Sequence, residues 1–144
     1  ENEHRLAIDY FVKALAENEK HLTARNNLAA LYLSHDYDEN AVTHYEILLQ
    51  QNPNDLEAHY NIGVAYMSLG VLDKACWHFE TLLKHDQKHV ASYTNLGAIY
   101  SKLNQPEKSL AYYEKALFYA PFDENIQFIV AAMKGEQRFE AAPN

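Results

Sequence analysis

The histidines are the residues whose spacing in this chain could support chemistry. Eight occur among 144 residues, and His85 and His89 lie four positions apart, an interval at which two side chains on one helix can bind a metal ion. A turn is predicted through residues 86–88, however, and no carboxylate or thiolate completes the ligand set. The chain also lacks a glycine-rich phosphate loop, a nucleophile motif and a buried pair of carboxylates. We therefore expect no metal, no cofactor and no enzyme activity.

Three asparagines offer a different chemistry, which is the recognition of peptide groups. Asn27, Asn61 and Asn95 recur at equal intervals along the sequence. Because a side-chain amide both donates and accepts hydrogen bonds, a row of amides can pair with the backbone of an extended ligand. The alternative is that Asn is common at this position and partly bonds its own scaffold.

The interval between these asparagines also organises the surrounding chain. One set of residues occurs three times, and its copies are Tyr93, Leu96, Gly97 and Tyr100, then His59, Ile62, Gly63 and Tyr66, then Arg25, Leu28, Ala29 and Tyr32. A fixed period of this length indicates an array of repeats, not a single globular core.

The spacing resembles that of the tetratricopeptide repeat (TPR), whose pattern is aromatic-x2-Leu-Gly-x2-Tyr followed by Ala, Phe or Tyr, Ala and Pro. The resemblance implies an all-α fold, an α-solenoid of helix-turn-helix repeats in a right-handed superhelix with a concave groove. It also implies a division into the second helix of a partial repeat over 1–21, repeats over 22–55, 56–89 and 90–123, and a C-terminal capping helix with a tail over 124–144.

Turn residues between the apolar periods support this division. Asp36, Gly70 and Asn104 stand where a left-handed backbone is needed after a first helix. Asp55 and Asp123 are placed to cap the helices that follow them. Pro106 suits the first turn of a helix, and a last helix is predicted over 124–140.

In TPR arrays the first helix of each repeat lines the groove, so the resemblance places the binding site on these helices. The expected ligand is a peptide or protein segment with apolar anchors. The expected groove residues are Asn26, Asn27, Leu33, Tyr60, Asn61, Val64, Met67, Thr94, Asn95 and Lys102. Lys102 does not match the Lys and Arg pattern of chaperone-binding TPR domains, so we do not expect this chain to bind chaperone C-termini.

Two further surfaces lead to alternative functions. Trp77 is expected to be partly exposed on the outer face, either as a second contact or lying flat over neighbouring side chains. The first helix has an apolar face around Phe11, through which we expect the chain to form a homo-oligomer or to belong to a longer array. The two alternatives to peptide binding are a self-assembling module and the substrate-recruiting segment of a larger enzyme.

Charge and apolar content exclude other classes of partner. Lys and Arg number 12 against 20 Asp and Glu, and the net charge of −8 opposes binding to nucleic acid and to anionic lipid. The apolar runs are too short to insert into a bilayer. The single cysteine, Cys76, excludes an intrachain disulfide and leaves the compartment open.

Overall fold

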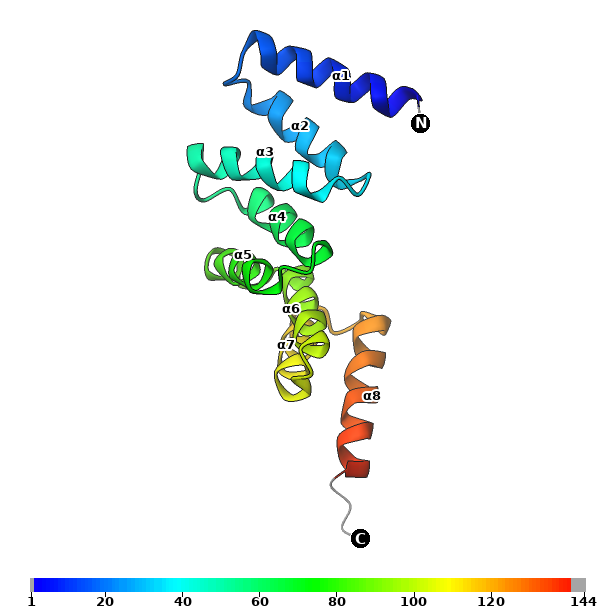
Figure 1. Cartoon of the computed structure of the whole chain (residues 1–144). Coiled ribbons are helices and arrows are strands. Elements are labelled where there is room, and N and C mark those ends of the chain that lie inside the picture. The colour runs from blue at the N-terminus through cyan, green and yellow to red at the C-terminus, as the bar shows by residue number, and fades with distance from the viewer. Residues whose placement is uncertain (1, 141–144) are drawn as a thin grey trace. The chain divides into compact units, whose positions relative to one another are not determined.

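The structure, a computed structural model, describes residues 2–140, and the side chains of residues 3–135 among them. These residues form eight α-helices and no strand, which confirms the all-α prediction (Figure 1). The helices are α1 (Asn2–Glu17), α2 (Leu22–Leu33), α3 (Asp38–Gln51), α4 (Leu56–Ser68), α5 (Leu72–His85), α6 (Val90–Lys102), α7 (Pro106–Tyr119) and α8 (Glu124–Glu140).

The chain divides into two compact units, and the division falls within α5, between His78 and Phe79. In the first unit α1 packs on α2, α2 on α3 and α3 on α4, and α2 also touches α4. Helices α2 and α4 are the first helices of successive repeats, so the residues expected to bind a ligand lie on neighbouring helices. In the second unit α6 packs on α7 and α7 on α8.

The turn after each first helix has the conformation that the sequence predicts. Asp36, Gly70 and Asn104 have φ angles of 60°, 74° and 55°. A backbone bond of 2.9 Å closes each of these turns, from the N–H five residues after Tyr32, Tyr66 or Tyr100 to the carbonyl of that tyrosine. Since glycine adopts positive φ without steric cost and Asn and Asp tolerate it, these residue types let each helix reverse direction.

Small residues allow the two helices of a repeat to approach closely. Gly97 and Ser109 are both buried, and the Ser109 hydroxyl donates to the Gly97 carbonyl at 2.7 Å. A Cβ atom added to Gly97 would lie 2.8 Å from two ring carbons of Tyr113. This distance is shorter than van der Waals contact, so the absence of a side chain at residue 97 is what lets α6 meet α7.

The predicted helix caps are present. The Asp55 side chain accepts from the Ala58 N–H, and the Asp123 side chain accepts from the Ile126 N–H, each at 3.0 Å. Pro106 is the first residue of α7, and α8 spans the predicted range. Ile126 and Val130 of α8 are buried in the core of the second unit.

Candidate functional site

In the first unit, the residues predicted to bind a ligand lie on two helices in contact. Asn26, Asn27 and Leu33 lie on α2, and Tyr60, Asn61, Val64 and Met67 lie on α4. Asn27 is exposed and the others are half-buried. The two helices therefore present amide and apolar groups that are partly accessible to a ligand.

The second unit contributes the other three predicted residues, all on α6. Thr94 and Asn95 are half-buried and Lys102 is exposed. The Thr94 hydroxyl donates to the Ala91 carbonyl at 2.9 Å, so it is already used within the helix. Asn95 thus keeps, on α6, the helix position that Asn27 and Asn61 occupy in the first unit.

Asn61 also interacts with its own scaffold. Burial raises the pKa of Tyr45 to about 12, the Asn61 side chain opposes this rise, and Glu57 and Asp55 add to it. The Tyr45 hydroxyl is fully buried, and no atom of the described residues forms a hydrogen bond of good geometry with it. The Asn61 side chain therefore lies close to the Tyr45 hydroxyl without forming a hydrogen bond of good geometry to it.

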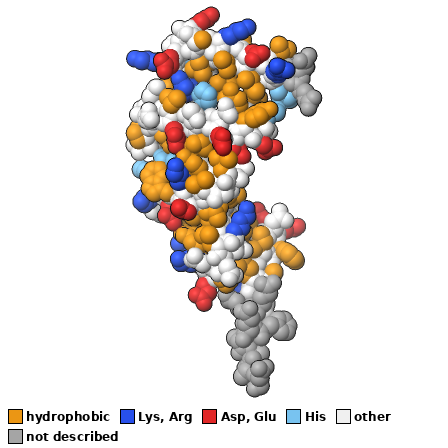
Figure 2. All heavy atoms as spheres, in the orientation of Figure 1, with side chains coloured by type: hydrophobic (Ala, Val, Ile, Leu, Met, Phe, Trp, Pro, Cys, Tyr) orange, Lys and Arg blue, Asp and Glu red, His pale blue; other side chains and the backbone are white. Residues whose placement is uncertain are grey.

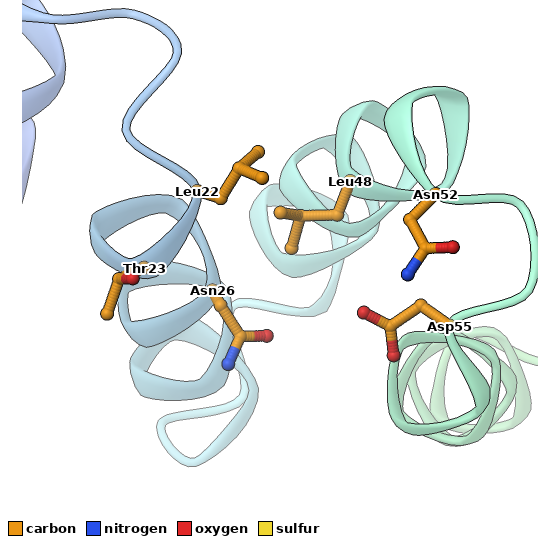
Figure 3. A pocket seen from close by; sticks show the side chains of 6 residues that line it. All are labelled: Leu22, Thr23, Asn26, Leu48, Asn52 and Asp55. Atoms are coloured by element: carbon orange, nitrogen blue, oxygen red, sulfur yellow. The ribbon is translucent and has the colours of Figure 1, made fainter.

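A cavity of about 270 Å³ opens beside the predicted residue Asn26 (Figure 3). Its walls come from α2, from the end of α3 and from the turn before α4. They consist of Leu22, Thr23, Asn26, Leu48, Asn52 and Asp55. Figure 3 shows the side chains of Asn26, Asn52 and Asp55 directed toward one another across this cavity. Sequence reasoning identified Asp55 only as a cap and missed Asn52, because residues of a turn fall outside the helix columns.

Side-chain hydrogen bonds to backbone carbonyls close the turns between repeats. The side chains that form them stand at the position where the family pattern has an aromatic residue. We call Arg25, His59, Tyr93 and Gln127 the turn-closing residues. Each bonds the carbonyl six residues before it, at 2.7 Å to Glu19, 3.0 Å to Pro53, 3.1 Å to Gln87 and 2.6 Å to Pro121. Because Gln127 stands one repeat after Tyr93 and makes the same bond, α8 continues the register of the first helices. The pattern of apolar residues in α8 does not show this register.

A buried histidine pair occupies one of these positions. The Nδ1 atoms of His59 and His78 lie 2.9 Å apart, and His59 Nε2 lies 3.0 Å from the Pro53 carbonyl. A carbonyl only accepts, so His59 carries a proton on Nε2, and in the neutral pair His78 donates through Nδ1. Burial, with smaller contributions from His59 and Lys74, lowers the pKa of His78 to about 4. His78 is therefore neutral at pH 7, and its contact with His59 is structural.

Trp77 is partly exposed, as the sequence predicts for the outer face. Trp77 is 58% exposed and lies beside the rings of His59 and His78, with centroid distances of 5.8 and 4.8 Å. Cys76 is half-buried. The Trp77 ring thus lies against a histidine pair, although much of it remains accessible.

Helix α1 exposes apolar side chains. Phe11 is half-buried, whereas Leu6 and Tyr10 are 64% and 69% exposed. Figure 2 shows a gathering of hydrophobic side chains over α1 and α2. The residues that face solvent here are therefore neighbours of Phe11 and only partly Phe11 itself.

Metal binding and membrane insertion find no support in the described part of the chain. His85 is the last residue of α5, whereas His89 caps α6 through a bond from the Ser92 N–H, so the two do not share a helix face. Residues 3–135, whose side chains are described, contain no group of three or more His, Cys, Asp or Glu that could hold a metal ion. None of the helices described combines the length and the apolar character needed to cross a bilayer.

Solved structures with the same fold have low sequence identity to this chain. A crystal structure of MamA aligns with a TM-score of 0.86 and 16% identity, over 94% of this chain and 74% of that one. MamA from Desulfovibrio magneticus RS-1 gives 0.79 and 19%, over 85% and 70%. YrrB, described as a TPR protein with an unusual peptide-binding site, gives 0.82 and 24%, over 91% and 67%. A search of curated proteins found no match.

Family models match the repeats directly. The model described as a tetratricopeptide repeat matches residues 90–123, a second model of that description matches 56–89, and one described as a TPR repeat matches 38–70. Together these matches span 38–123, which is more than half of the chain. The chain belongs to the tetratricopeptide repeat family.

Proposed function

We propose that this chain is an interaction scaffold that binds an extended segment of a partner protein through the first helices α2 and α4 of its first unit, and that Asn95 on α6 offers the same amide chemistry within the second unit. The observation that carries this proposal is the contact between α2 and α4, which brings two sets of partly accessible amide and apolar side chains side by side. Amides at one helix position of successive repeats can bond the backbone of an extended peptide. The peptide-binding site described for YrrB, a protein of this fold, supports the same use of the repeats.

Specificity in this proposal comes from apolar anchors. Leu33, Tyr60, Val64 and Met67 are half-buried, so a partner side chain can cover what remains exposed of them. Methionine adapts its shape to the group that it contacts, and tyrosine is enriched among the residues that dominate binding energy. Both suit a ligand with aliphatic or aromatic residues. Repeats of this family generally serve as interaction modules without catalytic activity.

The test is a selection of binders from a random peptide library displayed on phage, with the purified chain immobilised. Affinities of the selected peptides are then measured by fluorescence anisotropy. Replacing Asn27, Asn61 and Asn95 together by Ala should weaken binding. Each of these positions that is a hot spot should contribute a loss of about 1–3 kcal/mol in binding free energy. Trp77→Ala is the matched control on the outer face. Unchanged affinity in the triple variant, or a loss only in Trp77→Ala, would overturn the proposal.

Self-association through α1 is a second candidate, because Leu6, Tyr10 and Val12 are all exposed. Apolar surface of this kind marks contact sites on soluble proteins. Sedimentation at micromolar concentration should show a species larger than the 16.6 kDa monomer, and Tyr10→Glu should shift it toward the monomer. A monomeric wild-type chain would exclude this candidate.

A further inference from the structure

We propose that the cavity between α2, the end of α3 and the following turn holds a basic side chain, lysine or arginine, of the bound peptide. This inference rests on the proposed function and names one feature of its ligand. The cavity adjoins Asn26 on α2, so a peptide lying along α2 and α4 can direct one side chain into it.

The cavity has apolar walls beside a polar end. Leu22 is 45% exposed and Leu48 is buried, and both line the cavity. Asn26, Asn52 and Asp55 converge opposite them (Figure 3). Lysine and arginine have this same division, because a long aliphatic stem carries a charged head. A short polar or a purely aliphatic side chain would satisfy only one part of the cavity.

The polar groups of the cavity are available to a ligand. Within the described residues, the side chains of Thr23, Asn26 and Asn52 form no hydrogen bond. The Asp55 carboxylate uses one oxygen to accept from the Ala58 N–H at 3.0 Å. Amide oxygens, a hydroxyl and the second carboxylate oxygen therefore remain as acceptors, and an ammonium or guanidinium group supplies several donors.

The charged groups at this cavity favour a cation. No Lys or Arg is among the described residues that line the cavity, and Asp55 contributes a negative charge. Asn52 follows the C-terminal end of α3, which has no basic residue in its last turn to offset the negative end of its dipole. The positive ends of α2 and α4 also lie at this cavity, and both are capped. His21 Nδ1 accepts from the Ala24 N–H at 3.2 Å, and the Asp55 carboxylate accepts from the Ala58 N–H at 3.0 Å.

The third repeat provides an internal comparison. Its equivalent positions, two repeats later in the sequence, are Val90, Ala91, Thr94, Ala116, Ala120 and Asp123. The aspartate cap is preserved, with the same 3.0 Å bond to the following helix, but both asparagines are absent. Asp123 is therefore a matched control for Asp55, since both cap a helix and only Asp55 faces amides across a cavity.

The experiment repeats the peptide selection on wild type, Asp55→Asn and Asp123→Asn. Asparagine is also a good cap, so both variants should keep the fold, which circular dichroism checks. We expect the wild type to select peptides with Lys or Arg at one fixed position. Replacing that residue by norleucine, which keeps the aliphatic stem, should weaken binding to the wild type and to Asp123→Asn about tenfold. The same replacement should change binding to Asp55→Asn less than about twofold.

The outcomes separate this inference from the proposed function. Peptides that need the three asparagines but no basic residue would overturn the inference and leave the proposed function intact. A norleucine effect of equal size in Asp55→Asn would also overturn it, because the basic residue would then bind elsewhere. If the wild type selects no peptide, both proposals are wrong.

Discussion

Two turns of this molecule, one repeat apart in the sequence, are closed in the same way by different side chains. In the first, His59 bonds the Pro53 carbonyl at 3.0 Å, and its partner His78 stacks on Tyr66 at a centroid distance of 5.8 Å. In the second, Tyr93 bonds the Gln87 carbonyl at 3.1 Å, and its neighbour Tyr112 stacks on Tyr100 at 5.4 Å. In both turns, therefore, a side chain reaches the carbonyl and an aromatic ring stacks next to it.

The difference between the two turns is their response to pH. Two adjacent histidines cannot both be charged, since each would then donate toward the other. Burial is the largest cause that lowers the pKa of His78 to about 4. Burial instead raises the pKa of Tyr93 above its ordinary value of 10.0, with Tyr119 and Asp86 adding to the rise, so this side chain stays neutral in acid. The histidine turn should be sensitive to acid and the tyrosine turn should not.

The largest loss of stability should come from crowding the α6–α7 contact in the repeat that contains the tyrosine turn. Gly97→Leu places its Cβ 2.8 Å from the Tyr113 ring, and we expect the free energy of unfolding to fall by about 3 kcal/mol or more. Urea denaturation at pH 7 measures this change. Gly135→Leu is the control, because within the described part of the chain no neighbouring atom lies within 4 Å of its Cβ position. Leu favours a helix more than Gly does, so the control should lose no stability. A loss of equal size in the control would show that contact with Tyr113 does not explain the effect.

The histidine turn should contribute less to the free energy of unfolding in acid. An unfolded histidine has a pKa near 6.5 and folded His78 one of about 4, so the unfolded chain binds more protons between these values. The free energy of unfolding should fall by about 2–3 kcal/mol as pH decreases from 6.5 to 4, and this contribution should then stay constant. The His59→Tyr/His78→Tyr variant imitates the tyrosine turn and should lack this loss. An unchanged pH dependence in the variant would contradict the assignment to His78.

Removing the two turn-closing groups should have unequal effects. His59→Phe loses the bond to Pro53 and leaves the buried His78 ring without its partner, so we expect a loss of about 2 kcal/mol. Tyr93→Phe removes only the hydroxyl that donates to Gln87 and should cost about 1 kcal/mol. Thermal and urea unfolding of both variants at pH 7 compare these values. Equal losses would mean that the contact between the histidines adds no stability.

The smallest effect should come from the lysines over the stacked tyrosines. Lys74 Nζ lies 5.0 Å from the Tyr66 ring centroid, and Lys108 Nζ lies 5.3 Å from that of Tyr100. Each of Lys74→Met and Lys108→Met should change the free energy of unfolding by about 0.5 kcal/mol. Only Lys74→Met should raise the pKa of His78, because Lys74 is one of the groups that lower it. NMR titration of the histidine ring protons tests this, and an equal rise in Lys108→Met would contradict it.

Local rules predicted the parts of this fold that depend on one residue type at one position. The positive φ angles of Asp36, Gly70 and Asn104 and the helix caps of Asp55 and Asp123 were predicted correctly. Each depends only on the residue type and on the local backbone conformation. The turn-closing bonds of Arg25, His59 and Gln127 were not predicted, since the family pattern places an aromatic side chain there. Their signal is present in the sequence only as polar residues that recur once in each repeat.

The candidate site was less predictable than the fold. The register of the repeats placed Asn27 and Asn61 on neighbouring helices, but it did not indicate that Asn61 lies close to the buried Tyr45 hydroxyl. The cavity beside Asn26 depends on Asn52 and Asp55, which come from a turn whose path is set by packing. Side chains that a turn brings together do not recur at a fixed interval in the sequence, so periodicity cannot identify them.

The most direct test of the proposed function is to map a selected peptide on the chain by NMR. Side-chain amide signals of Asn report contact directly, and the Trp77 indole N–H reports on the outer face. We predict that a selected peptide shifts the side-chain amides of Asn26, Asn27 and Asn61 most and leaves the Trp77 indole signal unchanged. Shifts confined to Trp77 and its neighbours on the outer face, with the amides of α2 and α4 unmoved, would contradict the proposal.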